Sequence, residues 1–117
     1  MERLTKMYYK GKEILYVNYS GLKEDEMISL MNRHKYLILQ ENKPYMFLAD
    51  FTNARATPAY LKEADSFIKS TKNLVTRGAF MGVDAMKRII LNSVIQLYGV
   101  KYKAFDSKEK ALEALIA

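Results

Sequence analysis

Apolar residues recur along the chain with two different spacings, and their succession is clearest from residue 77 to residue 116. Residues 79–83 form a short apolar run typical of a strand, and a helix with apolar residues at every third or fourth position follows. The residues that we expect to form one buried stripe on that helix are Met86, Ile89, Ile90, Val94 and Leu97. Gly99 ends the helix, a further strand is expected over 102–105, and Asp106-Ser107 begins a last helix. A strand–helix–strand unit this short requires a parallel pair of strands joined by a helical crossover.

The first part of the chain has the alternation of a β-hairpin. Residues 7–9 and 13–19 flank Lys10-Gly11-Lys12, a short connection in which the glycine can adopt a positive φ. The second of these strands carries apolar side chains on both faces, as expected of an interior strand that is covered on two sides.

Two helices and one strand are expected between this hairpin and residue 77. The first helix starts at Glu24-Asp25-Glu26 and ends near Asn42, and a strand follows over 45–51. Thr57-Pro58 begins the second helix, with threonine as N-cap and proline at the first helical position. The predicted fold is one α/β domain spanning residues 1–117, in the order ββαβαβαβα. Its sheet is mixed but mainly parallel, with five strands and four helices.

Alternation along the strands sorts their side chains into two sets. The aromatic set comprises Tyr16, Phe47, Phe80 and Tyr102, and the mainly aliphatic set comprises Val17, Leu48, Met81 and Phe105. If the helices pack chiefly on one face, we expect them to cover the aliphatic set. The aromatic set then faces outward, where a second copy of the chain, a partner or a remaining helix covers it.

Composition narrows the classes of function. The chain has no cysteine, which excludes disulfides, a thiolate nucleophile and zinc-finger spacing. No apolar stretch approaches the ~20 residues of a membrane span, and no signal-peptide core follows the first residues. The net charge of +6 is spread thinly, with Lys87-Arg88 as the one basic pair. We therefore expect a cytoplasmic protein that neither binds nucleic acid nor spans a membrane.

Residues capable of catalysis are few. His34, the single histidine, lies in the apolar stripe of the first helix. We interpret it as a histidine at the rim of the core with hydrogen-bonded ring nitrogens, the alternative being a ligand or a general base near pH 7. No serine lies in a nucleophile elbow, and no phosphate-binding glycine loop is present. We expect no enzyme activity, no catalytic residue, no metal and no cofactor.

The loop after the third predicted strand is the best candidate for a binding surface. It carries Asp50, Thr52, Asn53, Arg55 and Thr57. In open parallel sheets, ligands bind at the carboxyl ends of the strands. Two interpretations are open, an Asx-type turn followed by a helix cap, or a loop that recognises a partner or ligand.

Several short motifs, taken in order, resemble the STAS-like domains, and specifically the branch similar to the sporulation anti-sigma-factor antagonist. The matching segments are Tyr19-Ser20-Gly21-Leu22, residues 48–54, Thr57-Pro58, residues 82–92 and residues 104–107, together with Ala111, Leu112 and Leu115. The match covers nearly the whole chain.

This resemblance implies a regulatory domain that binds a protein partner and catalyses nothing. In members of the family, a serine at the start of the helix after the third strand accepts a phosphate, which blocks docking to a partner kinase. This chain has Thr57-Pro58-Ala59 at that place. Because a capping hydroxyl already bonds to backbone amides, we expect Thr57 to act as a helix cap and not as a phosphoacceptor.

The same fold class resembles the lipid-carrying Sec14-like domains, so a small apolar ligand or a lipid is the alternative function. The chain has seven methionines, several of them on the inner faces of predicted helices. Methionines of this kind form either a pliable apolar pocket or an ordinary core.

Overall fold

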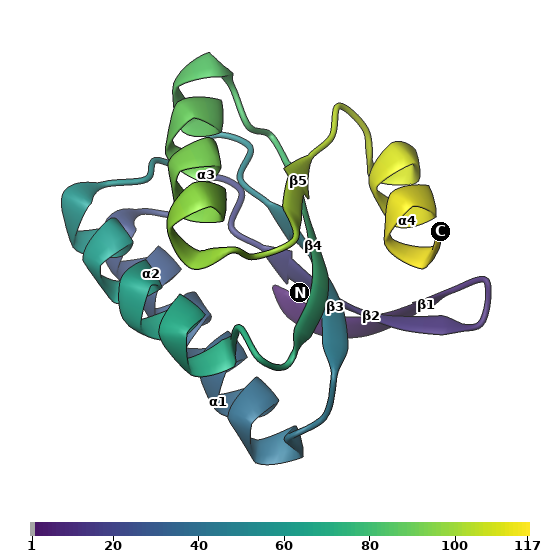
Figure 1. The fold of residues 1–117 in the computed structure, drawn as a ribbon. Coiled ribbons are helices and arrows are strands. Elements are labelled where there is room, and N and C mark those ends of the chain that lie inside the picture. The colour runs from purple at the N-terminus through teal and green to yellow at the C-terminus, as the bar shows by residue number, and fades with distance from the viewer. Residues whose placement is uncertain (1) are drawn as a thin grey trace.

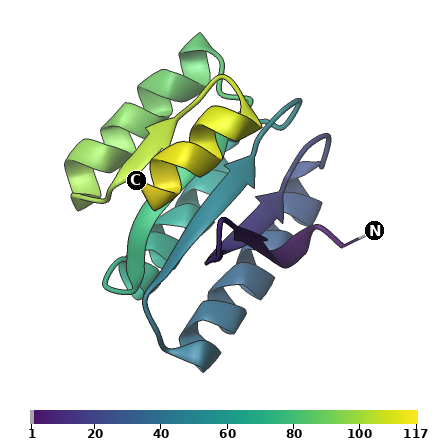
Figure 2. The same ribbon diagram turned by 90° about the vertical axis from the view of Figure 1, so that its right-hand side faces the viewer.

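The computed structural model describes residues 2–117 as a five-stranded sheet with helices on both faces (Figures 1 and 2). The predicted order ββαβαβαβα, the four helices and the mainly parallel sheet are confirmed. The elements are β1 (Leu4–Tyr9), β2 (Lys12–Asn18), α1 (Glu24–Glu41), β3 (Tyr45–Asp50), α2 (Pro58–Thr71), β4 (Val75–Met81), α3 (Ala85–Tyr98), β5 (Tyr102–Ala104) and α4 (Lys108–Ile116).

The strands lie in the sheet in the same order as in the chain. β1 pairs with β2 antiparallel, and the pairs β2–β3, β3–β4 and β4–β5 are parallel. Three successive crossovers of the same hand and direction place their helices on the same face. Accordingly, α1, α2 and α3 lie on one face of the sheet and α4 lies alone on the other, as Figure 1 shows.

Helix ends follow the local signals in the sequence. Thr57 and Asp84 cap α2 and α3 by accepting hydrogen bonds from the amides of Tyr60 and Lys87. Gly99 ends α3 in the left-handed region, with φ of 68°. The largest difference from the predicted bounds is in β4, which starts at residue 75, four residues before the predicted apolar run.

The predicted sorting of side chains into two faces is partly wrong. Phe47 and Tyr102 share one face of the sheet, as the sorting predicted, and this face lies under α1–α3. Val17 lies on the same face, whereas Tyr16 lies on the α4 side with Leu48. The parallel register, which pairs Tyr16 with Leu48, sets this arrangement. The helix-rich face is therefore the aromatic one, and the aliphatic face packs on α4. We expected the opposite.

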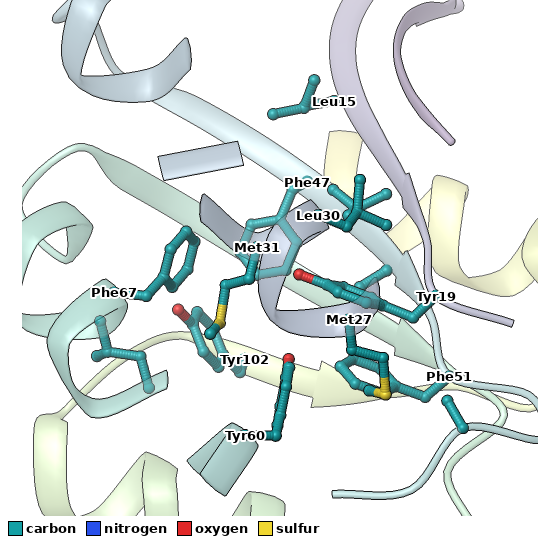
Figure 3. Packing of buried hydrophobic residues seen from close by; sticks show 14 of the residues in the cluster. Leu15, Tyr19, Met27, Leu30, Met31, Phe47, Phe51, Tyr60, Phe67 and Tyr102 are labelled. Atoms are coloured by element: carbon teal, nitrogen blue, oxygen red, sulfur yellow. The ribbon is translucent and has the colours of Figure 1, made fainter. Parts of the chain in front are cut away.

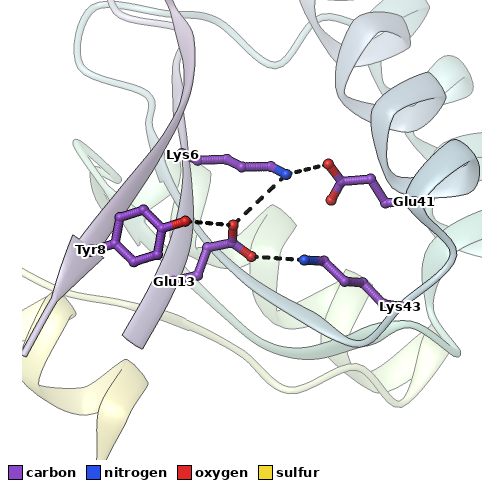
Figure 4. A network of polar contacts seen from close by, with 5 residues as sticks. All are labelled: Lys6, Tyr8, Glu13, Glu41 and Lys43. Carbon is purple, nitrogen blue, oxygen red and sulfur yellow. Dashed lines mark hydrogen bonds and ion pairs between the residues drawn. The ribbon is translucent and has the colours of Figure 1, made fainter. Parts of the chain in front are cut away.

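Partly exposed charges connect the β1–β2 hairpin to the end of α1 (Figure 4). Lys6 donates a hydrogen bond to the Glu41 carboxylate, and Lys43 donates to Glu13 at 3.2 Å. Tyr8 donates to the other oxygen of Glu13 at 3.3 Å. The hydrogen bond from Lys43 lowers the pKa of Glu13. Because these groups stay in contact with water, the network contributes little to the free energy of unfolding. Its main effect is to position the hairpin against the end of α1.

Candidate functional site

A partly open cavity of about 100 Å³ lies between the aromatic face of the sheet and helices α2 and α3. Its floor is formed by sheet residues, and its walls come from all three helices of that face. Figure 3 shows Phe67, Tyr60 and Tyr102 arranged around the side chain of Met31. Most of the lining is aromatic or aliphatic, which is the usual composition of small-molecule pockets.

Gly78 gives the aromatic floor its shape. A β-carbon at this position would lie 2.6 Å from Cζ of Phe47 and 2.8 Å from Cδ1 of Tyr102. Without one, the two rings lie directly over β4, and they meet edge to face with centroids 5.3 Å apart. The floor is therefore rigid and closely packed.

The wall formed by α3 is much looser. None of the 14 residues of α3 is buried, and its inward residues, Ile90, Leu91 and Val94, are only half-buried. The predicted single buried stripe is wrong, because Met86, Ile89 and Leu97 are 73%, 68% and 75% exposed. Helix α3 carries apolar residues all round, so periodicity did not identify its inner face. The cavity lies where this loosely packed helix covers the rigid floor.

Two residues that line the cavity each carry a buried polar atom with no hydrogen-bond partner among residues 2–117. The two atoms are Nε2 of His34, in α1, and the hydroxyl oxygen of Tyr102, in β5. The two residues are 2% and 7% exposed. A third unpartnered group, the hydroxyl of Tyr45, is not part of the cavity lining. Buried polar atoms almost always find a partner, so these atoms need an explanation.

His34 differs from our interpretation of it. It lies inside the core and not at the rim, with Phe67, Phe47 and Tyr45 rings at centroid distances of 4.8, 5.5 and 5.7 Å. Its Nε2 atom has no hydrogen-bond partner in the part of the chain that the structure describes. Burial lowers the pKa of His34 to about 3, so the imidazole is neutral at physiological pH.

The cavity interior carries no charge near neutral pH. Burial raises the pKa values of the Tyr19, Tyr60 and Tyr102 hydroxyls above their usual range, which keeps them protonated. Lys87 is the charged residue of the lining. Its Nζ atom donates to the carbonyl oxygens of Phe51 at 2.9 Å and Gly82 at 3.1 Å, so its charge is held at the ends of β3 and β4.

The loop after β3 has the geometry of an Asx turn followed by a helix cap. Asp50 Oδ1 accepts hydrogen bonds from the amide of Thr52 at 2.9 Å and from its hydroxyl at 2.7 Å. Asn53 has a left-handed backbone with φ of 56°. Thr57 caps α2, as predicted, and its hydroxyl donates to Glu24 in the first turn of α1. These contacts account for the conformation of the loop, and its role in recognition stays a prediction.

Four of the five predicted loop residues lie near one end of the sheet, but Thr57 lies apart from them. Thr52, Asn53 and Arg55 line a shallow groove together with Asp84 and Asp106 from the following loops. Asp50 accepts the hydrogen bond that orients Thr52 but is not part of the groove lining, whereas Thr57 donates to Glu24 of α1.

The predicted aromatic interface does not exist as one surface. Phe47 and Tyr102 are buried, and Phe80 lines the cavity beneath α3. Tyr16 is on the other face of the sheet, where the Lys108 ammonium lies 4.8 Å from its ring centroid. A homodimer through these four residues is therefore wrong, because helices of the same chain cover three of them. No sequence motif indicates the cavity directly, although the histidine in the apolar stripe of the first helix is one indirect sign.

Over residues 2–117, no group of three or more histidine, aspartate or glutamate side chains is placed to hold a metal ion. No helix in this part of the chain is long and apolar enough to cross a membrane. Comparison of the chain with protein-family models, with curated proteins and with solved structures found no match.

Proposed function

We propose that this domain binds a small apolar molecule in the cavity between the sheet and helices α2 and α3. The observation that carries the proposal is the pairing of a rigid aromatic floor with a wall, α3, that has no buried residue. Protein interiors are normally packed without voids larger than a water molecule. A cavity of about 100 Å³ lined by aromatic rings therefore supports binding of a ligand that completes the packing.

The size of the cavity limits the ligand. An engineered apolar cavity of about 150 Å³ accommodates benzene. A cavity of about 100 Å³ is smaller, so even a single ring requires a small outward shift of α3. The side chains of Leu91 and Val94 are only half-buried, so an outward shift of α3 exposes little additional apolar surface and costs little free energy.

Toluene titration, followed by NMR of the methionine and isoleucine methyl groups, tests this proposal. We expect saturable shifts at Met31 and Ile90, which line the cavity, and none at Met7, which packs against the α4 side. In the cavity-filling variant Val94→Phe, toluene binding should be lost. In the matched control Leu97→Phe, which adds the same ring to the exposed side of α3, binding should persist. Absence of saturable shifts in the wild-type protein up to the solubility of toluene would refute the proposal.

A regulatory protein-binding role is the second candidate, in line with the resemblance to anti-sigma-factor antagonists. The observation that favours it is the exposure of Met86 and Ile89 on the first turns of α3, which follow the shallow groove at Asp84. Exposed apolar side chains beside polar loops are typical of protein interfaces.

Site-specific photo-crosslinking in the native host tests this second role. A crosslinker at position 53 or 86 should capture one discrete partner, and the same crosslinker at position 62, on the exposed side of α2, should not. Equal capture at all three positions would mean that the groove and α3 have no special role.

A further inference from the structure

We infer that the molecule bound in this cavity is a small aromatic carboxylic acid, whose ring lies in the cavity and whose carboxylate accepts a hydrogen bond from the Lys87 ammonium. This inference rests on the proposed function and adds one charged group to the apolar ligand. It starts from the position of Lys87, the charged residue of the cavity lining.

Lys87 lies where the cavity adjoins the shallow groove at the carboxyl ends of the strands. Lys87 and Val83 belong to the linings of both the cavity and the groove. The Lys87 Nζ atom donates at 2.9 Å to the carbonyl oxygen of Phe51, which lines the cavity, and at 3.1 Å to that of Gly82, which lines the groove. The Lys87 residue is partly exposed. Its positive charge is therefore held at the boundary between the apolar cavity and a groove that is open to solvent.

No other side chain of the described residues neutralises this charge. None of the ion pairs within residues 2–117 includes Lys87. Of the two acids of the groove, Asp84 accepts a hydrogen bond from the backbone amide of Lys87 at 2.9 Å. The other, Asp106, pairs with Arg88 at 3.3 Å. An ammonium has three N–H donors, and the two carbonyl oxygens use two of them, so one remains for a ligand.

The remaining donor favours a carboxylate. A hydrogen bond between an ammonium and an anion is roughly twice as strong as one between neutral groups, so a carboxylate is preferred to a hydroxyl or an amide. A cationic ligand would be repelled by the lysine. A phosphate monoester carries up to about two negative charges and three acceptor oxygens, which one N–H donor does not match.

The two parts of the ligand have opposite preferences for their surroundings. The cavity interior is uncharged near neutral pH, because His34 and the buried hydroxyls of Tyr60 and Tyr102 are neutral. A carboxylate inside it would lose its hydration without gaining a partner. A planar ring, in contrast, makes edge-to-face contacts with the aromatic lining. A ring in the cavity with its carboxylate at Lys87 satisfies both preferences.

Titration with benzoate and with nitrobenzene, a neutral compound of nearly the same shape, tests this inference by methyl NMR. We expect both compounds to shift Met31 and Ile90, which line the cavity. In Lys87→Met, which keeps an apolar side chain without the charge, benzoate affinity should fall about tenfold while nitrobenzene affinity is unchanged. In the control Lys62→Met, which removes a positive charge outside both linings, neither affinity should change.

Salt dependence of binding to the wild-type protein gives a second measurement that needs no variant. Raising the sodium chloride concentration from about 0.01 to about 1 M should weaken the binding of benzoate, because salt screens the attraction between its carboxylate and the ammonium. The affinity for nitrobenzene, which has no net charge, should not fall.

The outcomes separate this inference from the proposed function. Binding of toluene and nitrobenzene without benzoate, or an equal loss of benzoate and nitrobenzene affinity in Lys87→Met, would overturn the inference and leave the apolar cavity as a binding site. Benzoate that shifts only residues of the groove, and neither Met31 nor Ile90, would also overturn it. Binding of none of the three compounds would overturn both.

Discussion

Gly78 and Phe47 are so close that a β-carbon on the glycine would lie 2.6 Å from Cζ of the phenylalanine. This contact is too short for any real side chain, so the position accepts only glycine while the ring stays in place. The ring in turn supports Phe80, Tyr102 and His34, with centroid distances of 5.5, 5.3 and 5.5 Å. One backbone position thus determines the floor of the cavity.

Gly78→Ala should lower the free energy of unfolding by about 1–3 kcal/mol, because the added methyl group displaces Phe47 in a closely packed core. Urea denaturation measures this change. The double variant Gly78→Ala, Phe47→Leu should lose less stability than the sum of the two single variants, since leucine leaves room for the methyl group. Strict additivity would show that the two residues are not in strained contact.

His34 should make the protein sensitive to mild acid. The folded state holds the neutral imidazole, with a pKa of about 3, whereas the unfolded chain takes up a proton near pH 6.5. Its contribution to stability is therefore complete above about pH 6.5. It falls as the pH decreases from there toward 3, by about 1.4 kcal/mol per pH unit.

Unfolding measured at pH 7 and pH 5 tests this prediction, and His34→Phe should remove most of the difference between them. Tyr45, the titratable residue whose ring packs against His34, stays neutral over this range because burial raises its pKa. An equally large loss of stability in wild type and His34→Phe would assign the pH dependence to surface carboxylates.

Thr57→Ala should cost about 1 kcal/mol of stability, because the hydroxyl accepts from the amide of Tyr60 and donates to Glu24. Thr57→Ser, which keeps the hydroxyl, is the matched control and should cost less. Intact-mass analysis of the protein from its host provides a separate test of the cap role. A phosphate present in the wild type and absent from Thr57→Ala would show that this residue is a phosphoacceptor after all.

Tyr102→Phe should raise the free energy of unfolding by about 1 kcal/mol when no ligand is present, because it removes a buried hydroxyl without a partner. Thermal denaturation of the two proteins side by side measures the change. A less stable Tyr102→Phe protein without ligand would mean that the hydroxyl is already satisfied, for example by a buried water.

Local signals in the sequence predicted the elements well, and signals that depend on packing predicted their surroundings poorly. The threonine cap at residue 57 and Gly99 act on their own backbone, so their roles could be inferred without the fold. The face on which Tyr16 lies depends on how β2 is aligned with β3. A shift of this alignment by one residue moves the side chain to the opposite face of the sheet. Both faces of β2 carry apolar side chains, so the pattern within this strand does not indicate which face lies under α1–α3.

The cavity was beyond prediction for a related reason. His34 and Tyr102 are 68 positions apart in the sequence, and both occur in patterns that indicate an ordinary core. Only the position of α3 shows that both residues line a space. Because α3 has apolar residues all round, its sequence does not specify how closely it packs.

The position of α4, alone on its face of the sheet, has a consequence for folding during protein synthesis. The face of the sheet that contains Ile14, Leu48 and Ala79 is covered by α4, which follows every strand in chain order. Arg77 holds the end of this helix by donating to the carbonyl oxygens of Ala114 and Ala117, at 2.9 and 2.7 Å. On the ribosome, β1–β4 can pair while this face is still open to water. We therefore expect the growing chain to expose an apolar surface that chaperones or other nascent chains can bind until residues 108–116 have left the exit tunnel.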